Sequence, residues 1–180
     1  MLYWGPGQSG KTQSVQWLAA HAPPRQAGAL LRLACESRQQ PASFDFVPLV
    51  LGELHGVSCR LHLYTTPGHV HCDSTRQSLL RQADGLVFVA DSHPDRQEAN
   101  LVSFEELQEG LQERAGGRSL PWVLQCSKQD LAGAVAPAAL AQAFGLGPTA
   151  AFVSRGRDGS GALAPLLALL EALVGANGLV

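Results

Sequence analysis

The chain has 180 residues, 46% of them hydrophobic, and a formal net charge of −2. A chain of this length suits one domain with one core, so we expect a single domain over residues 1–180. The weak negative charge gives no overall basic field, which argues against nucleic acid and an anionic membrane surface as main partners.

The N-terminal stretch has the pattern of a phosphate-binding loop. Residues Gly5–Thr12 fit G-x-x-x-x-G-K-[ST] at every fixed position. Apolar residues 1–4 precede them as a short strand, and a helix to about His21 follows, which is the context that this motif needs. Backbone N–H groups and the helix N-terminus would hold a polyphosphate. Lys11 would reach its β and γ phosphates, and Thr12 would be a ligand of Mg²⁺.

The middle of the chain is rich in strand signals. Residues 29–33 read as a short strand or an apolar loop, and a polar stretch follows at 36–43. Residues 44–54 then read as a strand in which Pro48 lies near an edge, because proline cannot donate to a central ladder. Residues 57–64 alternate apolar and polar side chains and read as its hairpin partner.

The second half of the chain alternates strands and helices. An unbroken apolar run at 85–90 is typical of a strand covered on both faces of a parallel sheet. The alternation predicts a three-layer α/β fold, with a mostly parallel sheet and helices on both faces. The other expected elements are helices at 75–83, 95–114, 137–144 and 162–174, and strands at 121–125 and 150–153.

Three loops leave the carboxyl ends of predicted strands, at residues 65–69, 127–130 and 154–156. In an open α/β sheet, ligands bind outside those strand ends. We therefore expect the chemistry of the protein in these three loops, together with Gly5–Thr12.

No segment reads as a secretion signal or a membrane span. The apolar tail at 162–174 is short and is interrupted by Pro165 and Glu171. The four cysteines lack C-x-x-C spacing, so we expect reduced thiols and no zinc or redox site. We expect a cytoplasmic protein without a direct membrane anchor, which partners recruit to a cell pole or membrane.

Several stretches resemble the small Ras-like GTPases, and within them the bacterial MglA type that works in gliding motility and cell polarity. Residues 3–12 resemble the phosphate loop of that family, 44–53 the segment after its first switch, 62–68 the entry to its second switch, and 84–92 its central strand. Where most Ras-like proteins have Asp in D-x-x-G, the MglA type has Thr, and here this position is Thr65. The resemblance implies a P-loop NTPase fold, one GTP-binding (G) domain, and a switch that uses GTP, GDP and Mg²⁺.

The resemblance also implies which residues contact the nucleotide. Asp130 stands where the family has a carboxylate that accepts two hydrogen bonds from guanine, and Lys128 where a lysine packs along the ring. Ser127 replaces the Asn of N-K-x-D, and the shorter side chain would lose a contact of about 1 kcal/mol. The implied nucleotide-binding set is Gly5, Gly7, Gln8, Ser9, Gly10, Lys11, Thr12, Gln13, Gly68, Ser127, Lys128, Asp130, Ser154 and Arg155.

The two switches depart from the family pattern. At the first switch the family has the sequence Glu-Thr-Asp-Arg-Thr. Its arginine acts on the γ-phosphate and its threonine is a ligand of Mg²⁺. In this chain, residues 36–40 at the same place are Glu-Ser-Arg-Gln-Gln. Arg38 is the candidate catalytic arginine, and Ser43 or Ser37 the candidate second hydroxyl at the metal. His69 stands where the family has the Gln that orients the attacking water. Hydrolysis of GTP depends mainly on positioning and charge stabilisation, so His can replace Gln in principle.

Three functions are compatible with these residues. The first is a GTP/GDP switch that hydrolyses GTP slowly, is activated by a roadblock-domain protein of the MglB kind, and acts on polarity or motility effectors. The second is a nucleotide-binding pseudo-GTPase scaffold with little or no hydrolysis, which the altered switches favour. The third is an ATP-dependent P-loop enzyme, against which Asp130 counts.

Overall fold

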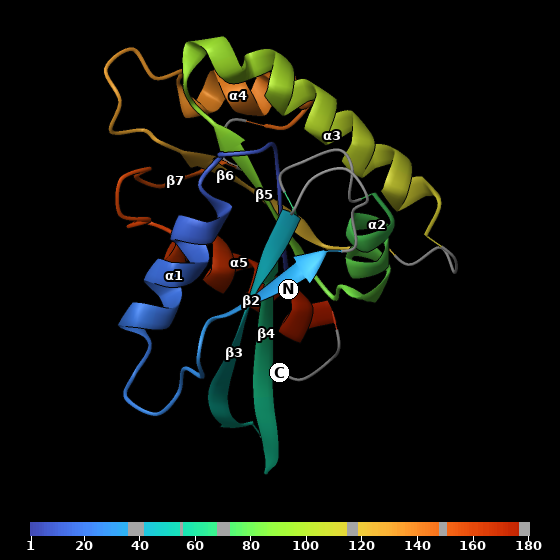
Figure 1. Cartoon of the computed structure of the whole chain (residues 1–180), viewed down its shortest axis with the longest axis vertical. Helices are drawn as coiled ribbons and strands as arrows, with labels where there is room; N and C mark the ends of the chain where they lie inside the picture. The colour runs from blue at the N-terminus through green and yellow to red at the C-terminus, as the bar shows by residue number, and fades with distance from the viewer. Residues whose placement is uncertain (36–41, 55, 68–72, 115–118, 148–150, 177–180) are drawn as a thin grey trace.

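Strands and helices alternate along the chain except at residues 31–65, where three strands follow one another (Figure 1). The structure, a computed structural model, describes residues 1–35, 42–54, 56–67, 73–114, 119–147 and 151–176. The elements in chain order are β1 (Leu2–Trp4), α1 (Lys11–His21), β2 (Leu31–Cys35), β3 (Ala42–Leu54), β4 (Val57–Thr65), α2 (Asp73–Gln82), β5 (Leu86–Asp91), the 3₁₀ helix η2 (Pro94–Arg96), α3 (Gln97–Gln112), β6 (Trp122–Ser127), α4 (Pro137–Ala143), β7 (Ala151–Val153) and α5 (Leu163–Ala176).

The strands in the described part of the chain form one seven-stranded sheet of order β2-β3-β4-β1-β5-β6-β7. The four ladders β1–β4, β1–β5, β5–β6 and β6–β7 are parallel, whereas β2–β3 and β3–β4 are antiparallel. The sheet is therefore mostly parallel, as the sequence predicts. β1 is short but lies at the centre, between β4 and β5, so it places the loop that follows it in the middle of the sheet edge.

Side chains alternate between two cores, one on each face of the sheet. In β1, Leu2 and Trp4 belong to one core, and Tyr3 belongs to the other together with Met1. The first core is covered by α2, α3 and α4, and the second by α1 and α5. β5 is buried along its whole length, as its apolar run predicts. This arrangement confirms the three-layer α/β fold.

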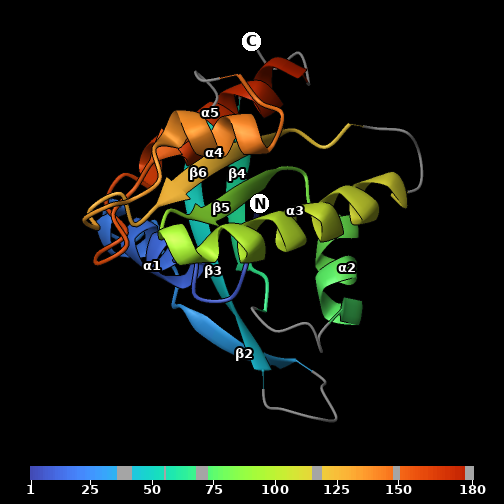
Figure 2. The same ribbon diagram turned by 90° about the horizontal axis from the view of Figure 1, so that it is seen from above.

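β3 and β4 form a long hairpin that extends beyond the rest of the sheet (Figure 1). β2 pairs only with Ala42–Phe46 of β3, and it lies at the edge of the molecule when seen from above (Figure 2). Pro48 lies beyond those pairs, and its carbonyl accepts a hydrogen bond from the N–H of Gly28 at 2.8 Å. Because Pro48 has no N–H group, this position outside the β2 ladder suits it: no strand needs a hydrogen bond from its nitrogen.

Two expectations need correction. The helix predicted at 95–114 begins as η2 and continues as α3, which ends at Gln112; Pro94 starts it because proline fits the first helical turn. Cys35 is disulfide-bonded, so the expectation of four reduced thiols is wrong at this residue, because spacing in the sequence does not show which segments meet in space.

Within the described residues, no helix combines the length and apolar character needed to cross a bilayer.

Candidate nucleotide-binding site

The phosphate loop, Gly5–Thr12, connects the end of β1 to α1. Gly5 has φ 148°, and a Cβ at this position would lie 2.3 Å from the carbonyl oxygen of Val89 in β5. Only glycine allows the loop to cross β5 at this distance. Gln8 (φ 65°) and Gly10 (φ 101°) also adopt positive φ. Residues with positive φ make successive N–H groups of a loop point into one concavity, and such a concavity binds anions.

Lys11 is buried in the phosphate loop, with 6% of its surface exposed. Its Nζ donates hydrogen bonds to the carbonyl oxygens of Gly5 at 2.9 Å and Pro6 at 2.7 Å. Burial, with smaller contributions from the positive charges of Arg76 and Arg96, lowers the pKa of Lys11 to about 7. The loop is therefore short of negative charge, and a polyphosphate would supply it.

Two arginines flank the phosphate loop. Arg76 of α2 is buried, donates to Glu106 at 2.7 Å, and lies over the ring of Trp4 at 4.3 Å. Arg96 of η2 donates from Nη2 to the carbonyl of Gly7 at 2.7 Å. Both arginines line a cavity of about 350 Å³ between the loop and α3. Sequence reasoning missed them, because no local pattern marks either residue.

The Thr12 hydroxyl, predicted as a metal ligand, donates to Oδ2 of Asp45 at 2.5 Å. Asp45 is 3% exposed, its N–H donates to Oγ1 of Thr65 at 2.8 Å, and its Oδ1 pairs with Arg32 Nε at 3.0 Å. Hydroxyl and carboxylate oxygens are the donors that Mg²⁺ prefers, so these residues fit the ion. In the described part of the chain, no three His, Cys, Asp or Glu side chains gather to hold a metal by themselves.

Sequence reasoning named Ser43 at the metal and missed Asp45. Ser43 is exposed and pairs with Ala34 of β2, two residues before Asp45 on the same strand. A signal for Asp45 was present, because a carboxylate stands between Phe44 and Phe46 in a predicted strand. A charge at a buried strand position needs polar partners, and Thr12 and Arg32 are the partners of this carboxylate.

The base loop, Ser127–Asp130, follows β6 and contacts the phosphate loop directly. Ser127 is buried, and its Oγ donates to the carbonyl oxygen of Ser9. A Cβ at Gly10 would lie 3.4 Å from the same Oγ. The serine in place of Asn therefore keeps a contact between the two loops.

Asp130, at the end of the base loop, is exposed to solvent. Its Oδ1 accepts a hydrogen bond from the N–H of Gly156 at 2.7 Å, and this bond is the main cause that lowers the pKa of Asp130. A Cβ at position 156 would lie 2.3 Å from Cγ of Lys128. A glycine at this position therefore lets the loop after β7 approach Lys128 and hold the Asp130 carboxylate.

The loop after β7, residues 154–162, contains the other two predicted contacts. Ser154 is buried and its Oγ accepts a hydrogen bond from Gln125 at 2.7 Å, whereas Arg155 is exposed. Gly159 packs so closely on α1 that a Cβ would lie 2.4 Å from the carbonyl oxygen of Gln13. The side chain of Gln13 is exposed, so the contact of this residue with the loop after β7 is made by its backbone carbonyl.

Asp91, at the end of β5, is a further site residue that sequence reasoning missed. It is fully buried, and its Oδ2 accepts a hydrogen bond from Lys128 Nζ at 2.6 Å. Arg96 Nε lies 3.7 Å from the same oxygen, and the N–H of His93 donates to Oδ1 at 3.0 Å. The signal was a carboxylate directly after the apolar run of the central strand. Asp91 connects Lys128 of the base loop to Arg96, which holds Gly7 of the phosphate loop.

The predicted residues of the two switches lie outside the described residues. They are Arg38, Ser37, Gly68 and His69. The candidate arginine, the alternative hydroxyl and the water-positioning histidine therefore stay predictions.

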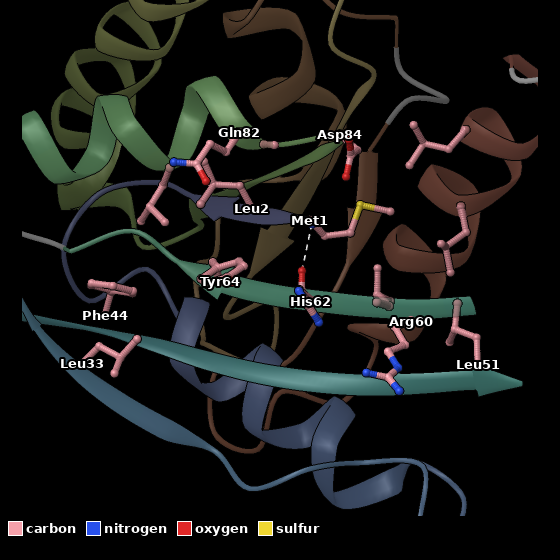
Figure 3. Close-up of a pocket in the computed structure, with 15 residues that line it drawn as sticks. Met1, Leu2, Leu33, Phe44, Leu51, Arg60, His62, Tyr64, Gln82 and Asp84 are labelled. Atoms are coloured by element: carbon pink, nitrogen blue, oxygen red, sulfur yellow. Dashed lines mark hydrogen bonds between the residues drawn. The ribbon is translucent and has the colours of Figure 1, made fainter. Parts of the chain in front are cut away.

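A larger cavity, of about 570 Å³, lies away from the phosphate loop (Figure 3). The ammonium group of Met1 beside it donates to the carbonyl of His62 at 2.9 Å. Figure 3 shows Phe44 near one end of the cavity and Leu51 near the other. None of the predicted nucleotide-binding residues lines this cavity. Size alone therefore does not locate the site, and we assign the cavity no ligand.

Comparison with known proteins gives one clear relationship. No family model matches the chain. The Mutual gliding-motility protein MglA of Myxococcus xanthus (strain DK1622) is 42% identical over 136 residues, which cover 75% of this chain and 69% of that protein. Identity of this level over most of both chains is that of members of one family.

Proposed function

Because the chain belongs to the MglA family of small Ras-like GTPases, we propose that its phosphate and base loops bind GTP and GDP with Mg²⁺ as a switch in cell polarity or gliding motility. The observation that carries this proposal is the hydrogen bond from Ser127 to the Ser9 carbonyl. It joins a phosphate cradle to a base-recognition loop at one edge of the sheet. One GTP-binding domain over residues 1–180 fits this arrangement.

Guanine recognition is assigned to Asp130 and Lys128. The Asp130 carboxylate is ionised near neutral pH, because its ordinary pKa already lies well below 7 and the hydrogen bond from Gly156 lowers it. An ionised carboxylate accepts both the N1–H and the exocyclic amine of guanine, whereas adenine offers no such pair of donors. Lys128 is fixed at Asp91, 2.6 Å away, which leaves its aliphatic stem to pack on the ring.

Mg²⁺ is assigned to Thr12, with Asp45 as its support. The Thr12 hydroxyl donates a hydrogen bond to Asp45, so the lone pairs of its oxygen are free to bind the ion. Bound Mg²⁺ neutralises charge on the β and γ phosphates. Asp45 would hold the Thr12 hydroxyl in the orientation that this role needs.

Hydrolysis is assigned to the switches. Arg38 would stabilise charge on the γ-phosphate, His69 would orient the water, and Ser43 would add a hydroxyl at the metal. Because these groups differ from the family pattern, we expect slow intrinsic turnover, accelerated by a partner. A scaffold with no hydrolysis is the less favoured alternative, since family membership supports a GTPase.

The partner is a roadblock-domain activator of the MglB kind, and effectors of polarity or motility would read the same switches. Four apolar residues beside the switches are candidates for contact with this partner: Phe44, Phe46, Leu49 and Leu51. Leu49 is 6% exposed and belongs to the core, so it is excluded from that surface. Phe44 and Phe46 are partly exposed and Leu51 is 46% exposed, so they remain available.

The experiment is a pair of measurements on the full chain. Isothermal titration with GDP and ADP tests the base, and we expect GDP to bind at least about 100-fold more tightly. Single-turnover hydrolysis of γ-labelled GTP, with and without a roadblock-domain partner, tests the enzyme. Equal GDP and ADP affinities would exclude the guanine assignment, and no turnover with any partner would favour the scaffold.

A further inference from the structure

Asp91 is a carboxylate without any exposed surface, at the centre of the sheet edge. A buried carboxylate needs cations and hydrogen bonds to offset the loss of water. The charged groups within 4.0 Å of its oxygens, among the described residues, are Lys128 and Arg96. Each of them has a second task, because Lys128 belongs to the base loop and Arg96 holds the carbonyl of Gly7.

We infer that Arg96 is a positioning residue for the phosphate loop, and that Asp91 couples it to Lys128. This inference rests on the proposed function. The connected groups are the Gly7 carbonyl, the Arg96 guanidinium, the Asp91 carboxylate and the Lys128 ammonium, at 2.7, 3.7 and 2.6 Å. Through them, the loop that binds guanine and the loop that binds phosphate form one unit.

The coupling has a simple electrostatic origin. Both cations share one oxygen, Oδ2 of Asp91. If Lys128 is removed, Arg96 becomes the remaining cation at a buried carboxylate and is drawn toward it, because an unpaired buried charge is costly. The hydrogen bond from Arg96 to Gly7 then lengthens, and the phosphate loop loses its support. A substitution of Lys128 in the base loop would thus weaken phosphate binding, although Lys128 does not contact the phosphate loop in this series.

The residue type at position 96 matters for the same reason. The arginine donates a hydrogen bond from Nη2 to Gly7, and its Nε lies 3.7 Å from Oδ2 of Asp91, at ion-pair distance without a hydrogen bond. A lysine has one nitrogen and cannot occupy both positions. Arg76 is a matched contrast in the same cavity, because it pairs with Glu106 and lies over Trp4.

The test is a double-mutant cycle on GDP affinity, with Arg96→Gln, Lys128→Met and the double variant. We expect each single change to weaken GDP by about tenfold and the double change to weaken it at least about fivefold less than the product of the two. The control cycle pairs Arg76→Gln with Lys128→Met, and there the two effects should multiply. If the double variant does not fold, Arg96→Gln with Asp91→Asn replaces it, because that pair leaves no buried carboxylate.

A spectroscopic measurement separates positioning from a general structural role. Asp91→Asn should shift the ³¹P resonance of the β-phosphate of bound GDP, although Asp91 is connected to the phosphate loop only through Arg96. Arg96→Lys should show the same shift, since it cannot restore both contacts. Multiplying effects in the Arg96–Lys128 cycle, or an unchanged resonance, would overturn the inference and leave the proposed function standing. Failure of the unaltered protein to bind GDP would overturn both.

Discussion

The phosphate loop and the base loop are held in different ways. The side-chain contacts of Lys11 and Ser14 that shape the phosphate loop go to Gly5, Pro6 and Gly10, which are close neighbours in sequence. The base loop is held from other segments: Ser127 by the phosphate loop, Lys128 by β5, and Asp130 by the loop after β7. The phosphate loop therefore has contacts from nearby residues in addition to those from Arg96 and Ser127, whereas the base-loop contacts named here all come from distant segments.

The largest effect is expected at the locally specified loop. Lys11→Ala removes the buried side-chain amine and with it the proposed charge-assisted contact to the β-phosphate, so GDP affinity should fall about a thousandfold or more. Isothermal titration measures this loss. Gln16→Ala changes an exposed residue of the same helix and should bind GDP normally. Near-normal binding by the Lys11 variant would refute the phosphate cradle.

The base loop should respond with a change of specificity. Asp130→Asn keeps an oxygen that can accept from Gly156, so the loop stays in place, but it cannot accept both guanine donors. We expect GDP to weaken by about 100-fold and xanthosine diphosphate to bind better. Competition between the two nucleotides measures the ratio. An unchanged preference for GDP would mean that guanine is read elsewhere.

An intermediate effect is expected at the metal. Asp45→Asn removes the charge that accepts the Thr12 proton, so the Mg²⁺ concentration needed to slow GDP release should rise about tenfold. Stopped-flow release of a fluorescent GDP at several Mg²⁺ concentrations gives this value. Arg32→Gln is the matched control, because the exposed Arg32 side chain pairs with Oδ1 of Asp45, whereas Thr12 donates to Oδ2. Equal shifts in both variants would exclude a specific role for Asp45.

The smallest effect concerns the stability of the nucleotide-free protein. The pKa of Lys11 is about 7 in the folded state against 10.5 ordinarily, so between these values the unfolded chain binds more protons. The free energy of unfolding should therefore increase from pH 7 to pH 8, by about 1 kcal/mol from this residue. Thermal unfolding of the protein and of Lys11→Met at both pH values isolates the contribution. A Tm difference between the two proteins that does not change with pH would contradict it.

The sequence alone predicted the parts of the site that local patterns encode. Gly5–Thr12 fits its motif, and the alternation of strands and helices predicted the sheet that carries it. Asp45 and Asp91 were missed because their partners, Thr12 and Lys128, are 33 and 37 residues away in the chain. A buried carboxylate becomes recognisable as functional only when the fold shows which cation or hydroxyl it meets.

The position of Trp4 gives the protein an internal optical probe. Its indole is fully buried directly before Gly5, donates to the Ser103 carbonyl at 2.9 Å, and lies under the guanidinium of Arg76. Any displacement of α2 moves that cation relative to the ring and alters the emission of the indole. Trp17 on α1 is stacked on His21 and Trp122 of β6 packs on Phe104, so these two indoles also contribute to the emission. Nucleotide exchange should therefore be visible in the unlabelled protein as a change in tryptophan fluorescence.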